Sequence, residues 1–214
     1  MSEYATITAV HHIPRKSSRR RIDLHDGTSF SVDLGLMTRR GLRVGMELDS
    51  AARESIQAED AGTRAKATAM DILRTRPRTR KEMLDRLAKK GFDEVASETA
   101  VCALEELGYI SDEEYADTYV QSRMRGKPKG RWAMLRELQA KGIDRTTIDR
   151  ALTAVSDEDE RDAAIRVARL QFGRYHTLPR DVAHRRMYQF LLRRGFAYEH
   201  VATALREVMG SGPA

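Results

Sequence analysis

A six-residue pattern decides the fold: LAKKGF at residues 87–92 returns as LQAKGI at 138–143 and as LLRRGF at 191–196. The glycines of the three segments are 51 and 53 residues apart. A methionine stands eight residues before each glycine, and an alanine stands nine residues after it. These residues are Met83, Met134 and Met187, followed by Ala100, Ala151 and Ala204. The register holds without a gap, and internal periods of this size indicate stacked helical units.

Each copy has the pattern of a helix that ends at its glycine. Met83 and Leu87, at i and i+4, lie on one face of a helix. Basic residues in the last turn suit the negative end of the helix dipole, and glycine supplies the left-handed conformation that terminates it. Phe92 is then expected to fold back onto the helix. Asp93 and Asp144 are predicted N-caps of the helices that follow.

Capping-box spacings mark further helix starts at Thr79 and Ser111, with a weaker version at Ser156. Together these signals predict a mainly α fold with three tandem three-helix repeats in an elongated stack, at 67–109, 110–155 and 156–210. The predicted helices are 64–74, 79–90, 93–107, 111–125, 130–141, 144–155, 157–173, 179–194 and 197–209.

The N-terminal part, 1–49, follows a different pattern. The segment 5–13 alternates loosely with β-branched residues, and the segments 21–25 and 30–34 are predicted strands around an Asp-Gly pair at 26–27, which indicates a β-hairpin in a flap of two or three strands. We expect a small β-hairpin extension that buries little by itself and leans on the helices behind it. The polar, helix-permissive segment 50–66 is predicted to be a helical linker.

The composition favours a binding protein whose helices each bury one stripe of apolar side chains. Charged residues make up 33% of the 214 residues and aromatic residues only 6%. The formal net charge is +6, which favours polyanionic partners through counterion release. The alternative is that the basic residues only provide solubility. The placement of the charge has to distinguish a polyanion-binding protein from this alternative.

Several classes of protein are disfavoured by the residues themselves. One cysteine, Cys102, excludes a disulfide framework within the chain, and it is expected to be a buried structural thiol. The six histidines have no metal-ligand spacing, and no phosphate-binding glycine loop or nucleophile elbow is found. No signal peptide or membrane span is apparent. We therefore expect a cytoplasmic, monomeric protein that is not an enzyme and uses no cofactor or metal.

The candidate binding residues cluster in the loop between the first and second helix of each repeat. Because this loop holds one position in the repeat, stacking should align its charges in a stripe, as an extended polyanion or an acidic groove of a partner requires. The alternative is an ordinary solvated loop. The candidates are Arg74, Arg76, Arg78, Arg80 and Lys81 in the first repeat, Arg123, Arg125, Lys127, Lys129, Arg131 and Trp132 in the second, and Arg185 and Arg186 just after the loop 173–180 in the third.

Trp132 is the only tryptophan of the chain. In the register of the repeat it matches Lys81 and Arg185, which are polar positions rather than core positions. An exposed indole here could stack on a base or fill a pocket of a partner. It could equally pack over the first helix of its own repeat.

The second repeat carries motifs that resemble a known family. They are LGYISDEEYA at 107–116, VQSR at 120–123, KGR at 129–131 and LRELQAKGI at 135–143. This segment looks like the core signature of the RecX family, bacterial regulators of the RecA recombinase. The resemblance is strongest over about 70–155 and weaker in the third repeat, and the N-terminal hairpin is similar to the β-extension of many members.

The resemblance implies a modular stack of three-helix units that lies in the groove of the RecA–single-stranded DNA filament. Such proteins inhibit ATP hydrolysis and strand exchange by RecA, favour filament disassembly and use no cofactor. The second interpretation is a direct DNA-binding protein, for single-stranded or duplex DNA, with the second and third helices of a repeat as a helix-turn-helix. The acidic start of the third helix, at Asp93 and Glu94, speaks against that interpretation. The third interpretation is a general adaptor for another partner.

Overall fold

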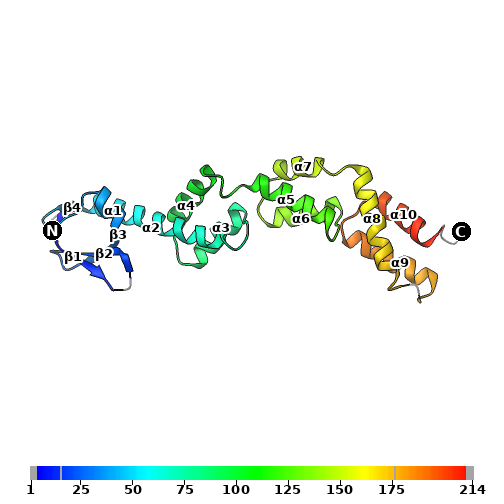
Figure 1. Cartoon of the computed structure of the whole chain (residues 1–214), viewed down its shortest axis with the longest axis horizontal. Helices are drawn as coiled ribbons and strands as arrows, with labels where there is room; N and C mark the ends of the chain where they lie inside the picture. Colours follow the sequence, from blue (N-terminus) through cyan, green and yellow to red (C-terminus); the bar gives the residue numbers. More distant parts are fainter. Residues whose placement is uncertain (1–3, 15, 176, 211–214) are drawn as a thin grey trace. The chain divides into compact units, whose positions relative to one another are not determined.

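The computed structural model describes residues 4–14, 16–175 and 177–210, and this part of the chain is mainly helical (Figure 1). The chain divides into two compact units, which are described one at a time. The first comprises Met1–Arg76 and Met83–Tyr109, and the second comprises Pro77–Glu82 and Ile110–Ala214. His176, in the third candidate loop, lies outside the described residues.

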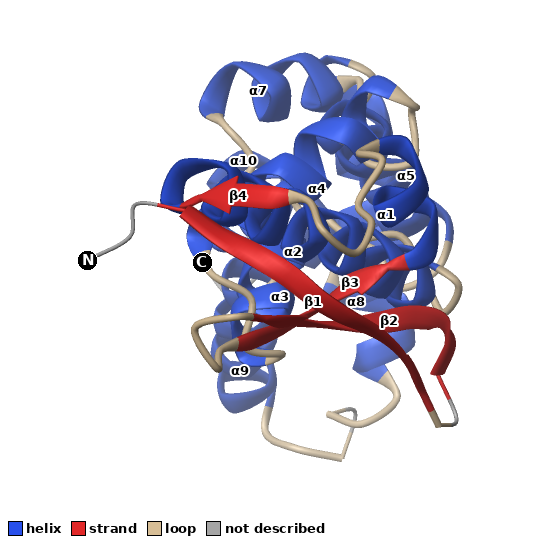
Figure 2. Cartoon of the chain, turned by 90° about the vertical axis from the view of Figure 1, so that its left-hand side faces the viewer, coloured by secondary structure: helices blue, strands red, loops and turns tan. Residues whose placement is uncertain are grey.

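The first unit begins with a four-stranded antiparallel sheet of order β3-β2-β1-β4, drawn in red in Figure 2. The hairpin predicted around the Asp-Gly turn is confirmed as β2 and β3. The turn is closed by Asp26, which accepts a hydrogen bond from the backbone nitrogen of Thr28 (2.8 Å), and by Gly27 at φ +80°. The elements are β1 (Tyr4–Ile13), β2 (Lys16–Leu24), β3 (Ser29–Asp33), α1 (Leu34–Arg39) and β4 (Glu47–Asp49).

The sheet is larger than the predicted extension, and its core includes Leu36 of α1 and Ile56 of the helix that follows β4. The sheet therefore leans on that helix, as expected. The pattern of hydrophobic residues gave no signal for β4, because this strand is only three residues long, or for the six-residue α1. The buried residues of this core are Ile7, Ile22, Leu24, Val32, Leu36, Leu42, Leu48 and Ile56.

Helix α2 (Ser50–Leu73) runs without a break through the segment predicted as a linker. It is capped by Asp49 and so begins well before residue 64, the predicted start. Asp60, in its middle, is only 3% exposed and accepts from the guanidinium of Arg19 (2.8 Å) and the backbone nitrogen of Asp33 (2.8 Å). These bonds attach the sheet to the helix.

Apart from the start of α2, the helices of the repeats begin and end within a few residues of the predicted positions. All three methionines that precede the glycines are fully buried, as predicted. After α2, the helices are α3 (Arg80–Lys89), α4 (Glu94–Glu106), α5 (Asp112–Arg125), α6 (Arg131–Ala140), α7 (Arg145–Thr153), α8 (Asp157–Phe172), α9 (Arg180–Arg193) and α10 (Tyr198–Met209).

The glycine turns have the conformation that the sequence predicts. Gly91, Gly142 and Gly195 have φ values of +87°, +85° and +83°, in the left-handed region. The residue after each glycine donates its backbone N–H to a carbonyl five residues earlier, as Phe92 does to Leu87 (3.2 Å). This bonding closes the helix and directs the chain into the next one.

The predicted N-caps are confirmed. Asp93 accepts from the backbone nitrogen of Ala96 (2.7 Å), and Asp144 accepts from that of Thr147 (2.9 Å). The spacing at Ser156, predicted as the weaker capping box, forms a complete one: Ser156 and Asp159 bond reciprocally.

Cys102 is exposed, so the prediction of a buried thiol is wrong. The buried face of α4 is made by Ala100, Val101 and Leu104, at a spacing of three and four residues. Cys102 is one residue past Val101 on the helix, and the rotation of about 100° per residue turns it away from that face.

Candidate interaction surface

The start of α6 is fixed to the glycine turn between α9 and α10. The backbone nitrogen of Gly130 donates to the Arg194 carbonyl (2.9 Å), and that of Trp132 donates to the Gly195 carbonyl (3.2 Å). The Arg194 guanidinium donates to the carbonyl of Pro128 (3.0 Å). The loop between the first two helices of the second repeat therefore joins that repeat to the third.

Similar bonds occur inside the second unit, between residues 79–82 and the second repeat. The hydroxyl of Thr79 donates to the Lys141 carbonyl in the next glycine turn (2.8 Å). The Lys141 ammonium pairs with Glu82 (2.6 Å), and the backbone nitrogen of Arg80 donates to Asp112 (2.8 Å). Part of each basic loop is thus a joint between repeats, a role that the sequence interpretation missed.

The structure divides the predicted contact residues into three groups by exposure. Only the exposed group leaves a large part of the charged or aromatic side chain open to solvent. The exposed residues are Arg74, Arg76, Lys81, Arg125, Lys127, Trp132, Arg185 and Arg186; the half-buried ones are Arg80, Arg123, Lys129 and Arg131; Arg78 is buried. Because Arg78 is only 7% exposed, we leave it out of the contact surface.

The half-buried cations of the second loop are held in place by neighbouring side chains. Arg123 lies over the ring of Tyr119, with its guanidinium carbon 4.7 Å from the ring centre. The Lys129 ammonium pairs with Glu137. Burial lowers the pKa of Lys129, and the nearby positive charges of Arg123 and Arg194 lower it further. Arg194 therefore belongs to this basic cluster, although the sequence placed it only in a helix end.

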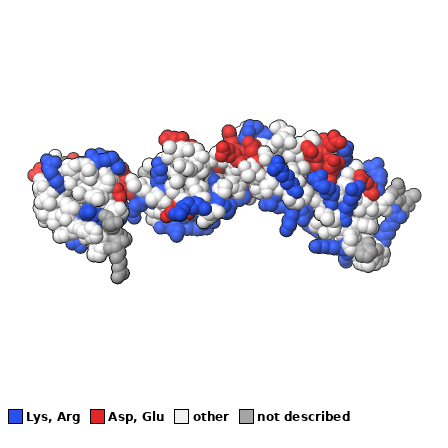
Figure 3. Space-filling view, viewed as in Figure 1, with Lys and Arg blue, Asp and Glu red and all other residues white. Residues whose placement is uncertain are grey.

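The charges of the second unit are segregated. The first turns of α5 and α8 are acidic, and Figure 3 shows red patches over these helix starts and blue side chains mainly along the opposite edge. Arg74 and Arg76 belong to the other unit. The alignment of all three loops in one stripe therefore stays a prediction.

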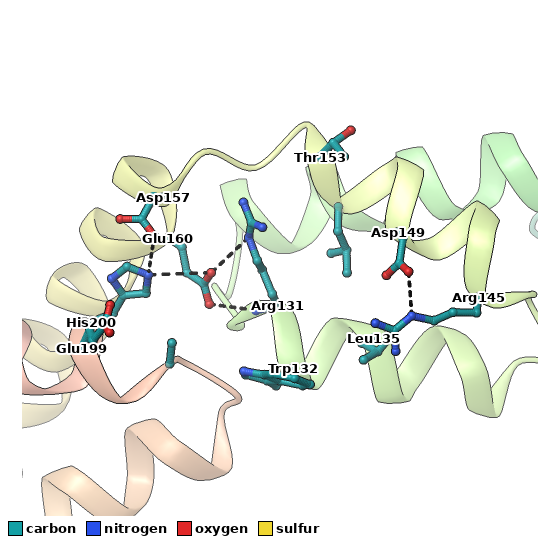
Figure 4. Close-up of a pocket in the computed structure, with 12 residues that line it drawn as sticks. Arg131, Trp132, Leu135, Arg145, Asp149, Thr153, Asp157, Glu160, Glu199 and His200 are labelled. Carbon is teal, nitrogen blue, oxygen red and sulfur yellow. Dashed lines mark hydrogen bonds and ion pairs between the residues drawn. The ribbon is translucent and has the colours of Figure 1, made fainter.

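Trp132 is 60% exposed, so of its two interpretations the structure supports the exposed one. It lies at the edge of a pocket of about 350 Å³ between the second and third repeats (Figure 4). Leu135 and Leu152, both nearly buried, provide apolar lining. We call this pocket the Trp132 groove. Its lining residues are Arg131, Trp132, Leu135, Arg145, Asp149, Leu152, Thr153, Asp157, Glu160, Ala197, Glu199 and His200.

The ion pairs within the groove connect α6 to α8 and α10, as the dashed lines of Figure 4 show. Glu160, 3% exposed, accepts from the backbone nitrogen of Arg131 (3.0 Å) and pairs with its guanidinium (3.2 Å). The imidazole of His200 lies 3.2 Å from Asp157 and 3.9 Å from Glu160. The guanidinium of Arg131 also donates to the Val155 carbonyl.

Within the described ranges, no group of three or more histidine, cysteine or acidic residues could hold a metal ion. None of the helices described there is long and apolar enough to cross a membrane.

Three-helix domains in tandem, joined at glycine turns and carrying exposed cations, define a helical-repeat binding protein. Family models match each repeat: the first three-helix domain of RecX over 65–104, the second over 111–152 and the third over 157–205. The chain belongs to the RecX family.

Relatives and solved structures agree with this assignment. Regulatory protein RecX of Bacillus licheniformis is 32% identical over 201 residues, which cover 94% of this chain and 76% of the relative. That of Clostridium botulinum is 25% identical over 209 residues, covering 96% and 97%. A crystal structure of regulatory protein RecX matches with a TM-score of 0.74 and 26% identity, covering 97% of this chain and all of the other. RecX from Lactobacillus salivarius matches with a TM-score of 0.63 and 27% identity, covering 71% and 98%. Both relatives are named as regulatory proteins.

Proposed function

We propose that this chain regulates the RecA recombinase by binding in the groove of the RecA–single-stranded DNA filament. It suppresses ATP hydrolysis and strand exchange and favours disassembly of the filament. The observation that carries the proposal is that all three repeats match RecX domains, in a chain whose inter-helix loops expose cations. On this proposal the protein acts in the cytoplasm, as a monomer and without a cofactor.

The proposed mechanism combines the exposed cations with the joints between repeats. Arg125, the last residue of α5, and Lys127, in the loop that follows, are exposed, and the residues just after them are bonded to the next repeat. Cations held at a fixed position on a rigid joint contact phosphates or acidic protein edges at little cost in side-chain ordering. A chain of such joints spans neighbouring RecA protomers and opposes their ATP-linked movements.

A comparison of three ligands tests this proposal against direct binding to DNA. The binding of the protein is measured at one salt concentration on naked duplex DNA, on naked single-stranded DNA and on single-stranded DNA coated with the cognate RecA. Preference for the coated strand is expected, because the filament supplies both phosphate and protein contacts. Equal or tighter binding to naked DNA would instead support the helix-turn-helix interpretation.

A further inference from the structure

The Trp132 groove differs in charge from the loops around it. Four carboxylates line it, Asp149, Asp157, Glu160 and Glu199, against two guanidinium groups. Both of the guanidinium groups are engaged inside the groove. Arg131 pairs with Glu160, and Arg145 pairs with Asp149 (2.7 Å).

Two carboxylates are left at the end of the groove formed by α8 and α10. The side chain of Asp157 is 88% exposed, and its contact there is the imidazole of His200. Glu199, in the first turn of α10, is exposed as well. Apart from His200, the groove has two more acidic than basic side chains, in a chain whose formal net charge is +6.

The backbone that carries the indole is held in place by bonds to neighbouring elements. The backbone of Trp132 donates to Gly195, and its neighbours Arg131 and Ala133 are tied to Glu160 and to the helix start at Gly130. An exposed tryptophan on a fixed backbone loses little freedom on binding, and an aromatic face attracts a cation. Trp132 and the apolar side chain of Leu135 thus line the same pocket as Asp157 and Glu199.

We propose that the Trp132 groove binds a protein segment in which lysine or arginine alternates with apolar side chains, and that it does not bind nucleic acid. The apolar side chains pack on Trp132, Leu135 and Leu152, and the cations approach Asp157 and Glu199. A phosphate backbone placed in the groove would meet the same carboxylates and be repelled. The chain thereby separates its two kinds of contact: cationic loops for polyanions and an anionic groove for protein. The groove proposal depends on the proposed function in one respect only: the proposed function would identify the protein that carries this segment.

The fluorescence of Trp132 tests the proposal directly, because the 214-residue chain has no other tryptophan. Three probes are titrated: a tryptophan-free peptide of alternating leucine and arginine, a peptide of alternating leucine and glutamate, and single-stranded oligothymidylate. The leucine–arginine peptide is expected to change the emission saturably. The leucine–glutamate peptide and the oligonucleotide are expected to leave it unchanged, although the oligonucleotide binds elsewhere, as fluorescence anisotropy of a labelled strand would record.

The double variant Asp157→Asn/Glu199→Gln is expected to weaken binding of the leucine–arginine peptide roughly tenfold, from two lost charge contacts. Asparagine still offers an oxygen to His200, so the fold is kept, and circular dichroism checks it. The matched control, Glu113→Gln/Glu114→Gln, removes two exposed charges at the start of α5 and is expected to bind like the wild type.

An oligonucleotide that changes Trp132 emission as strongly as the cationic peptide would overturn the proposal. So would equal peptide binding by the groove variant and the control variant. Neither RecA nor ATP is present in this titration. A failure of RecA regulation would therefore leave a positive result standing, and a negative result would overturn the groove assignment alone.

Discussion

At the scale of single residues, the glycines between the second and third helices have two separate roles. All three adopt a left-handed conformation, which a β-carbon resists. Gly142 and Gly195 also lie where the preceding repeat packs closely, against Lys81 and Ala133. Gly91 has open space around it. The first role is shared by every repeat, and the second belongs to the joints.

Substitution of these glycines is expected to separate the two roles. Gly91→Ala should cost about 1–2 kcal/mol of unfolding free energy from the backbone conformation alone. Gly195→Ala should cost roughly 1–3 kcal/mol more, because the new β-carbon would overlap the backbone of Ala133. Urea unfolding followed by circular dichroism measures both losses, and equal losses would show that the close packing at Gly195 has no energetic weight.

Asp144 is expected to make the second repeat sensitive to acid. Hydrogen bonds from Thr146 and Thr147 hold the pKa of this carboxyl well below its usual value of 3.8. The folded state thus binds the proton less readily than the unfolded state, so the stabilisation is present above pH 3.8 and is lost as the pH falls below it. The stability difference between wild type and Asp144→Ala should shrink from neutral pH to about pH 3. A difference that stays constant over this range would contradict the assignment of the cap.

At the scale of elements, the features that the sequence predicts correctly are those that recur at the same position in each repeat. Glycine turns, aspartate caps and the buried methionines follow from local chemistry repeated three times, and the structure has all of them. The short strand β4 and the continuation of α2 depend on contacts distant in sequence, such as Arg19 with Asp60, which no local pattern reveals. The joint role of Arg131 and the acidic groove beside Trp132 likewise require side chains from four helices to be placed together.

Two kinds of cation in the second loop are expected to respond differently to substitution. Arg131→Ala removes the partner of the buried Glu160 and the bond to Val155, and should lower stability by about 1–2 kcal/mol after allowance for solvent around the half-exposed guanidinium. Arg125→Ala/Lys127→Ala should change stability by less than about 0.5 kcal/mol, because both residues are exposed. Thermal or urea unfolding compares the two variants, and equal stability would contradict the joint role of Arg131.

The exposed pair is expected to affect binding instead. If Arg125 and Lys127 contact phosphates of single-stranded DNA in the filament, the double variant should reduce the slope of log affinity against log salt by about 1.4. Lys89→Ala/Lys90→Ala, which removes two exposed charges outside the predicted contact loops, should keep the wild-type slope. An unchanged slope in the Arg125/Lys127 variant would assign these cations to protein contacts or to none.

At the scale of the whole molecule, the chain is a succession of repeats, and the same hydrogen-bond pattern occurs at each joint. In each joint, the start of a second helix bonds to the glycine turn of the next repeat and to a carboxylate of its first helix: Asp112 in one joint, Glu160 in the other. Stacked repeats contact only their neighbours in the chain. On the proposed function, this arrangement would suit a regulator that contacts several protomers of a filament.

The most direct test of RecA regulation is the single-strand-dependent ATP hydrolysis of the cognate RecA, with this protein titrated in at moderate salt. Inhibition at substoichiometric amounts is the predicted result. The Arg125→Ala/Lys127→Ala variant should need roughly tenfold more protein for the same inhibition. Unchanged hydrolysis together with tight binding to bare DNA would contradict the account and indicate a DNA-binding protein built on RecX domains.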